Sequence, residues 1–305
     1  MDASEPKHRP LLALGIRLAA IAALATMSAL VKLAGERGVH LLEILFWRQF
    51  VTIPIALGWV MATGGLAMLR TDRPRTHAKR ALYGMVGMIL NFGGLLLLPL
   101  AEATTMGFTA PIWAVILSTL LLGEKVGVYR WGAVALGFAG VLVIAQPGGG
   151  HIPLFGAAAA LSGAFMVALI SIQIADLNRT DKPLTIVFWF AAISTATTVL
   201  ALPFVSTSHD AGEWALLIGI GIVGGAGQLL LTSALRVGKV ASVIVMDYSS
   251  LFWATLYGWT IWNMLPPTST WVGVPLIVAA GLVIAWREHR LARPSNRDVA
   301  RVEGT

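Results

Sequence analysis

The sequence of 305 residues contains no cysteine, so disulfide bonds, thiol nucleophiles and cysteine-ligated zinc are excluded. Charged residues are also scarce, at 12% of the chain against about 25% in ordinary soluble domains. Hydrophobic residues instead make up 57% of it. A water-soluble protein of this length has too little interior to hide so much apolar surface, and we therefore expect the excess to face lipid.

Motifs for catalysis and nucleotide binding are missing as well. All six histidines fall in expected loops or tails, and no His-Glu-x-x-His metal motif is present. A Gly-Lys-Ser/Thr phosphate-binding loop is also lacking, which excludes ATP-driven transport by this chain alone. Gly219, Gly221 and Gly224 have the spacing of a dinucleotide fingerprint, but no strand precedes them and Lys239 stands where an acid is needed. We expect no enzyme activity, no cofactor and no metal site.

Ten stretches are apolar and long enough to cross a membrane as helices. A crossing needs about 20 residues, since a rise of about 1.5 Å per residue must span about 30 Å. The stretches are Leu11–Leu33, Leu42–Thr63, Ala81–Leu98, Ala103–Leu122, Val128–Ala145, Pro153–Ile174, Leu184–Val205, Trp214–Leu235, Ala241–Trp262 and Trp271–Trp286. The first is longer than the apolar part of a signal peptide, so we interpret it as an uncleaved helix. The sequence predicts an all-α integral membrane protein with ten transmembrane helices.

Lysine and arginine lie almost entirely on one side of this predicted bundle. If successive helices alternate in direction, that side receives both termini and every even-numbered loop, while the other receives Arg37, with Lys32 close to it. The positive-inside rule then places both termini in the cytoplasm. The same distribution explains the net charge of +7 by topology and contact with anionic lipid, and argues against nucleic-acid binding.

The chain contains two related halves. The stretch WGAVALGFAGVLVIA at Trp131–Ala145 resembles VGVPLIVAAGLVIAW at Val272–Trp286 and pairs Gly140 with Gly281. We expect a cytoplasmic N-terminus at 1–10, a five-helix repeat at 11–147, a glycine-rich linker at 148–151, a second five-helix repeat at 152–286 and a basic cytoplasmic tail at 287–305. Because five is odd, the second repeat has the opposite orientation, which predicts inverted repeats around a central cavity.

Several motifs of the first half resemble a known family. They are Phe46-Trp47-Arg48, the LPLAEATT turn from Leu98, Pro111, the LLLGE sequence ending at Glu124, and the helix with Gly132 and Gly140. Together they resemble the EamA-type, ten-helix branch of the drug/metabolite transporter superfamily, and within it the aromatic-amino-acid exporters. The resemblance implies two inverted five-helix repeats and movement of amino acids or other small metabolites across the bacterial inner membrane. The second half departs from the pattern, because Asp247-Tyr248-Ser249-Ser250 falls where a proline would match Pro111.

Charged side chains inside the predicted spans require a reason, because each costs about 2.5–3.5 kcal/mol at a helix centre. Asp247 is the acid furthest inside a span, and we expect it either to couple protons or bind a substrate ammonium group, or to cross-link helices through Tyr248 or Ser250. Arg48 either reaches the outer interface or turns inward to bind a carboxylate. Glu124 lies at the cytoplasmic boundary, and we interpret it as a gate or structural charge, like Arg48.

Uncharged polar and aromatic residues supply further candidates for the pathway. Thr105, Thr109 and Trp113 share one broad helix face, and the proline between them frees a backbone carbonyl near mid-membrane. Amide and aromatic side chains within spans serve either as packing contacts or as substrate contacts. The remaining pathway candidates are Asn91, Gln228, Tyr248, Trp189 and Trp253. Pro54, Pro111 and Pro275 lie inside spans and are expected to act as hinges.

These observations predict a secondary transporter that exports amino acids, aromatic or of broad range, across the bacterial inner membrane by alternating access. The transport class comes from composition and the repeat, and the substrate comes from the resemblance. Two alternatives stay open: an exporter of other small metabolites or drugs, and a passive channel. The expected partners are a small-molecule substrate and membrane lipid; a monomer suffices for a pathway, and a dimer is compatible with the sequence.

Overall fold

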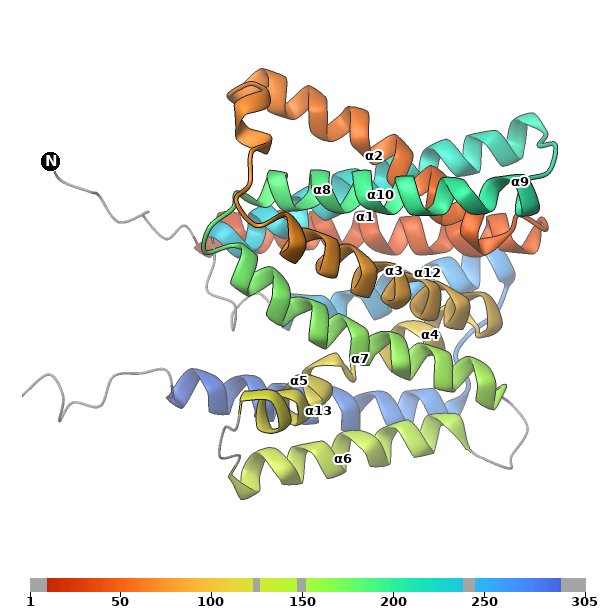
Figure 1. Ribbon diagram of the computed structural model, residues 1–305. Coiled ribbons are helices and arrows are strands. Elements are labelled where there is room, and N and C mark those ends of the chain that lie inside the picture. Colours follow the sequence, from red (N-terminus) through yellow and green to blue (C-terminus); the bar gives the residue numbers. More distant parts are fainter. Residues whose placement is uncertain (1–9, 123–126, 147–151, 238–244, 292–305) are drawn as a thin grey trace, which may run out of the picture.

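Helices make up all the regular structure in the parts of the chain that the computed structural model describes, residues 10–122, 127–146, 152–237 and 245–291 (Figure 1). The α-helices are α1 (Pro10–Glu36), α2 (Leu41–Thr63), α3 (Pro74–Leu97), α4 (Leu100–Gly107), α5 (Ala110–Leu122), α6 (Val128–Ala145), α7 (Leu154–Leu177), α8 (Pro183–Thr198), α9 (Leu202–Val205), α10 (Ala211–Val237), α12 (Ser249–Trp262) and α13 (Thr268–Leu291). Short 3₁₀ helices lie at η1 (Leu66–Leu69), η2 (Val199–Ala201) and η3 (Val245–Tyr248).

Within the described residues, eight helical stretches are long and apolar enough to cross a membrane. They correspond to the first four, the sixth to eighth and the tenth of the predicted spans. The fifth is the shorter apolar helix Trp131–Ala145 within α6, and the first residues of the ninth, Ala241–Trp262, lie outside the described residues. The all-helical, multi-pass membrane architecture is therefore confirmed.

The outer surface of the bundle carries large apolar side chains. Leu120, Phe155 and Phe204 are each more than 70% exposed, and Met61 and Leu82 more than 60%. They belong to different helices, so the apolar surface is distributed around the bundle. Large apolar side chains exposed on so many helices are unfavourable in water, and their distribution is that of a protein surrounded by lipid.

Helices that are distant in the sequence form the main contacts of the bundle. α1 packs along α10, α3 along α7, and α6 along α13. In Figure 1 the α6–α13 pair forms one edge, and α1 begins on the same side on which α13 ends. A Cβ atom at Gly140 would lie 2.8 Å from the carbonyl oxygen of Gly273, so glycine is what allows α6 and α13 to approach so closely.

The predicted fourth helix, Ala103–Leu122, is divided into α4 and α5. Pro111 has no backbone N–H, and its ring would clash with the carbonyl of Gly107 in an unbroken helix. The backbone N–H groups of Phe108 and Thr109 instead bond to the carbonyls of Thr105 and Met106, three residues back, at 3.0 and 3.1 Å. The fourth span is therefore present as two successive helices, and the break precedes the proline that causes it.

Candidate functional site

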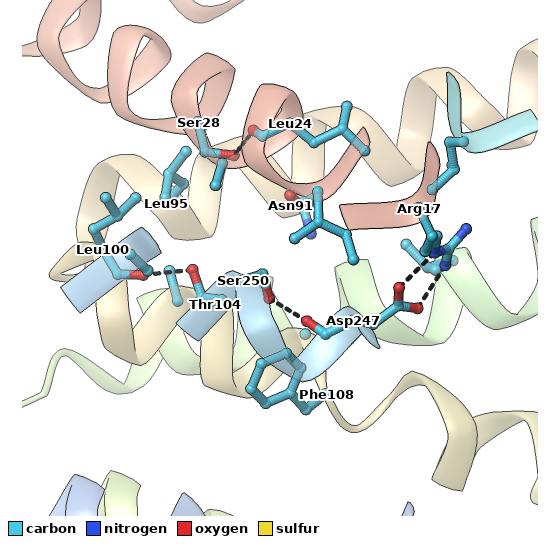
Figure 2. Close-up of a pocket in the computed structure, with 17 residues that line it drawn as sticks. Arg17, Leu24, Ser28, Asn91, Leu95, Leu100, Thr104, Phe108, Asp247 and Ser250 are labelled. Atoms are coloured by element: carbon cyan, nitrogen blue, oxygen red, sulfur yellow. Dashed lines mark hydrogen bonds and ion pairs between the residues drawn. The ribbon is translucent and has the colours of Figure 1, made fainter. Parts of the chain in front are cut away.

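A cavity of about 350 Å³ lies among α1, α3, α4 and the η3–α12 segment, with contributions from α7 and α10. Figure 2 shows Arg17 and Asp247 at one end and Leu100 at the other, with Asn91, Ser250 and Thr104 between them. The rest of the lining is mainly apolar, including Leu24, Leu95, Phe108, Val167 and Leu231. Apolar walls with a few polar groups are typical of a small-molecule site.

Arg17 and Asp247 form a bidentate ion pair at that end. Nε of Arg17 donates to one carboxylate oxygen at 2.7 Å and Nη2 donates to the other at 2.6 Å (Figure 2). The Arg17 side chain is 9% exposed and that of Asp247 38%, so the acid is the more accessible partner. Nη1 of Arg17 is buried and has no hydrogen-bond partner within the described part of the chain. The pair therefore places an accessible carboxylate beside a buried guanidinium N–H group that lacks a hydrogen-bond partner among the described residues.

The hydroxyl groups along the cavity are held by their own backbone. Ser28 donates to the carbonyl of Leu24 at 3.0 Å, Thr104 to Leu100 at 2.8 Å and Ser250 to Asp247 at 2.6 Å (Figure 2). A hydroxyl whose proton is engaged still has lone pairs that accept hydrogen bonds. The middle of the cavity is therefore richer in acceptors than in free donors.

Asn91 occupies the wall that α3 provides. The backbone of α7 approaches α3 at this level, because a Cβ atom at Gly163 would lie 2.9 Å from the Asn91 Cα atom. Asn91 is half-buried and lines the cavity in Figure 2. Of the predicted pathway residues, Asn91 and Asp247 are brought together here.

Thr105, Thr109 and Trp113 lie outside the lining of this cavity. Thr105 and Thr109 are fully buried, and their hydroxyls donate to the carbonyls of Ala101 and Met106, each at 2.7 Å. The Trp113 ring packs edge-on against Phe138 and Phe165 at centroid distances of 5.2 and 5.5 Å. The cavity uses the neighbouring face of α4, with Thr104 and Phe108, because the break before Pro111 separates Trp113 from the α4 face.

The other predicted pathway residues are also placed elsewhere. The Trp189 indole donates to the carbonyl of Leu69 at 2.9 Å, and Trp253 stacks on Tyr257 at 6.1 Å. The Tyr248 ring meets Phe108 edge-on at 5.0 Å, and its hydroxyl packs against Gly281. Gln228 is half-buried on α10, where its carbonyl accepts from Thr232 at 2.7 Å. Tyr248 thus supports the cavity wall from behind Phe108.

Arg48 turns inward and is only 6% exposed. Its guanidinium group donates to Gln49 Oε1 at 2.7 Å and to the sulfur atoms of Met27 and Met88 at 3.2 and 2.9 Å. It thus occupies an interior position with sulfur and amide partners, instead of reaching the interface or a carboxylate. Glu124, the other predicted gate or structural charge, lies outside the described residues.

The three prolines predicted as hinges have different surroundings. Pro111 follows the break between α4 and α5, whereas α2 and α13 continue unbroken through Pro54 and Pro275. Both of these prolines are exposed on the outside of the bundle. A hinge role for each of the three stays a prediction.

Sequence reasoning missed Arg17, Thr104 and Phe108 as cavity residues. Arg17 lies well inside the first predicted span and is the one charged residue between Arg9 and Lys32. That isolation was a usable signal, since a charge inside a span needs a partner. Its partner was unpredictable, because Asp247 is 230 positions away.

His209 lies in the loop between α9 and α10, outside the spans, where it contacts glutamates from the first turns of α2 and α10. His209 contacts Glu43 at 2.8 Å through Nε2 and Glu213 at 3.0 Å through Nδ1, and Ser206 donates to the same oxygen of Glu43 at 2.9 Å. Burial alone would lower the pKa of His209, but the hydrogen bonds and charges of the two glutamates outweigh it, so that pKa is raised above its usual value. In the described part of the chain, neither this group nor any other set of three or more His, Asp or Glu side chains has an arrangement that could hold a metal ion.

Comparison with known proteins gives consistent matches along the chain. A riboflavin transporter of Vibrio cholerae is 27% identical over 294 residues, covering 95% of this chain and 98% of that one. The pseudopaline exporter CntI of Pseudomonas aeruginosa is 29% identical over 282 residues, covering 90% and 97%. An S-adenosylmethionine uptake transporter of Rickettsia prowazekii is 27% identical over 268 residues, covering 85% and 87%.

The fold is similar to that of a protein solved by crystallography. The TM-score is 0.63 at 23% sequence identity, with 93% of this chain and all of that chain covered, and this likeness shows the fold alone. Residues 12–146 and 154–286 each match the EamA-like transporter family. The chain therefore belongs to the EamA-like transporter family of the drug/metabolite transporter superfamily, as the motifs around Pro111 and Glu124 predicted.

Proposed function

We propose that this transporter is a secondary exporter of amino acids, aromatic or of broader range, and that it works by alternating access in the bacterial inner membrane. The observation that carries the proposal is the Arg17–Asp247 pair in the wall of the cavity. An amino acid has a carboxylate and an ammonium group on one carbon. Nη1 of Arg17 offers a donor to the first, and the accessible Asp247 carboxylate offers an acceptor to the second.

The remainder of the cavity suits the side chain of such a substrate. Leu24, Leu95 and Leu231 offer apolar contact, and Phe108 adds an aromatic ring. Asn91 supplies both donors and an acceptor near the polar end. A broad range of side chains is compatible with walls that are mainly aliphatic, because dispersion contacts are not directional.

Alternating access requires two halves that move relative to one another. We propose ten crossings arranged as two inverted five-helix repeats, residues 11–147 and 152–286, joined by 148–151. In these repeats α1 corresponds to α7, α3 to α10 and α6 to α13. The symmetry therefore relates the α1–α10 pair to the α7–α3 pair and relates α6–α13 to itself. All three pairs are major contacts of the bundle. Residues 1–10 and the basic tail at 287–305 are then cytoplasmic, which agrees with α1 beginning on the side where α13 ends (Figure 1).

Within this scheme the break before Pro111 and the prolines Pro54 and Pro275 act as hinges, and Arg48 is a structural charge. Thr105, Thr109 and Trp113 line the pathway in another state of the cycle. One copy encloses the cavity, so a monomer is sufficient for transport.

Counterflow into proteoliposomes tests the proposal. Vesicles loaded with unlabelled phenylalanine or tryptophan are expected to accumulate the labelled amino acid with saturation, and the labelled compound is recovered unmodified. Riboflavin and S-adenosylmethionine, the substrates named for relatives, are the comparison arms. Uptake of these without any amino acid uptake would reject the substrate assignment; flux without saturation would indicate a channel.

The role of Asp247 is tested in the same vesicles. If Asp247 binds the substrate ammonium group, Asp247→Asn raises the half-saturating concentration without an imposed pH gradient. If it carries protons, the variant instead loses the response to a pH gradient. Unchanged counterflow in both conditions would remove Asp247 from the mechanism.

A further inference from the structure

A second, smaller cavity of about 180 Å³ continues the first one toward the opposite end of α1. Its lining includes Lys32, Leu100, Glu102, Trp262, Met264 and Pro266. Leu100 lines both cavities and is 3% exposed, so its side chain forms the partition between them. Arg17 and Lys32 are separated by about 22 Å along α1, at about 1.5 Å per residue.

Glu102 is the unusual residue of this cavity. It is 2% exposed, and its Oε1 atom accepts one long hydrogen bond of 3.5 Å from Thr270. Its Oε2 atom is buried and has no donor within the described part of the chain. A buried acceptor without a partner is costly, and a buried carboxylate more so, so a donor from a ligand would stabilise this oxygen.

Lys32 lines the same cavity, but its ammonium group is held by other atoms. It donates to the carbonyls of Leu98 at 2.8 Å and Leu95 at 3.3 Å, where α3 ends. Glu36 lies 3.9 Å away on the next turn of α1, and its other oxygen accepts from the Trp262 indole at 2.6 Å. Lys32 is therefore anchored, contributing positive charge to the cavity while leaving Glu102 Oε2 unoccupied.

The ligand that fits this arrangement carries N–H donors, positive charge and an apolar part. The donors would meet Glu102 Oε2, and the apolar part would lie against Trp262 and the Met264–Pro266 segment. A carboxylate on the same molecule would be attracted by Lys32. A zwitterionic amino acid has all of these features.

We propose that this cavity is a second substrate-binding chamber, in which Glu102 accepts a hydrogen bond from the ammonium group of the amino acid. The inference rests on the proposed function and extends it. The substrate passes Leu100 as it moves between the Arg17–Asp247 chamber and the Glu102 chamber. Its ammonium group binds the Asp247 carboxylate in the first and the Glu102 carboxylate in the second. Residues 264–267, between α12 and α13, line the second chamber, and this segment lies at the end of the bundle where α1 ends and α13 begins.

Counterflow measured separately from the two sides of the membrane tests this assignment. Glu102→Gln keeps the size of the side chain and removes its charge, and we expect the half-saturating concentration on the side opposite the termini to rise about tenfold. The half-saturating concentration on the side of the chain termini is expected to change less than about twofold. Glu102→Asp is expected to recover part of the loss. The matched control is Glu213→Gln, which removes a charge in the first turn of α10 that lines neither cavity.

A comparison of two ligands and a second variant keep the test valid even if Glu102→Gln folds poorly. Glu102→Gln is expected to leave recognition of the N-acetylated amino acid unchanged, because that analogue has no ammonium group. Met264→Trp fills the cavity from a half-exposed position, and it is expected to weaken binding from the same side only.

Different failures have different meanings. Absence of saturable amino acid counterflow in the wild type would reject the proposed function itself. If the wild type shows counterflow but Glu102→Gln behaves like Glu213→Gln, or loses activity equally on both sides, the second chamber alone is overturned. Loss of the response to a pH gradient with ammonium recognition intact would identify Glu102 as a proton carrier and also overturn it.

Discussion

Arg17 and Asp247 share two hydrogen bonds, of 2.7 and 2.6 Å, across 230 positions of the chain. The contact joins the first turns of α1 to the η3 segment that precedes α12. It thereby joins a helix of the first half of the chain to a segment of the second half. The polar end of the larger cavity is built from this one contact.

Breaking this pair is expected to impair transport more than exchanging its members. Arg17→Asp or Asp247→Arg alone places two like charges together and is expected to lower counterflow by at least about tenfold, the factor that corresponds to 1.4 kcal/mol. The double variant Arg17→Asp with Asp247→Arg restores the pair and is expected to recover part of the activity. A double variant as inactive as both single variants would show that the orientation of the pair, beyond its formation, is required.

The contact between α6 and α13 is expected to tolerate no side chain at Gly140. A Cβ atom there would meet the Gly273 carbonyl, which is backbone and has little freedom to move. Gly140→Ala is therefore expected to lower the free energy of unfolding in detergent by about 1–3 kcal/mol. Gly132→Ala is the control on the same helix, because a Cβ atom at Gly132 meets nothing within 4 Å. Equal stability of the two variants would contradict the close approach.

The His209 cluster predicts how stability depends on pH. The pKa of His209 is raised in the folded protein, so its stabilising contribution is fully present below the unfolded pKa of about 6.5 and is lost as the pH rises through the folded pKa. Thermal unfolding of the wild type is expected to occur at lower temperature as the pH rises through that range. His209→Gln is expected to flatten this dependence.

The control for that measurement is His40→Asn. His40 caps the start of α2 by accepting the Leu42 N–H group at 3.2 Å, and asparagine retains a capping acceptor. This variant is expected to keep the wild-type pH dependence. If His209→Gln keeps the full pH dependence of thermal unfolding, that dependence arises from other titratable groups.

The helix break is expected to serve the conformational change. Pro111→Ala supplies a backbone N–H that is able to bond to the Gly107 carbonyl and join α4 to α5. We expect the counterflow rate to fall several-fold with little change in the half-saturating concentration, since the cavity lining is untouched. Pro74→Ala is the control, because Pro74 is an exposed residue at the first position of α3, where a proline breaks no helix. A similar loss in both variants would argue against a special role for the break.

The sequence by itself determined the helical membrane architecture, the family and much of the segment order. Hydropathy and helix length are local properties, so each apolar stretch is readable without knowledge of its neighbours. Pro111 predicts a bend or break in the fourth span, because the effect of a proline is also local and is confined to about one helical turn. The isolated charges Arg17 and Asp247 are visible in the sequence as well.

The tertiary structure alone decided which of these side chains meet. Thr105 and Thr104 are neighbours in sequence, yet one bonds within the buried core and the other lines the cavity, because the rotation of α4 is set by packing against α7 and α12. The role of Glu102 in a cavity cannot be predicted from its local sequence, because only the fold encloses its carboxylate beside Lys32 and Trp262. Such pairings depend on long-range packing between helices, and a pattern that repeats every 3.6 residues carries no information about the partner across the bundle.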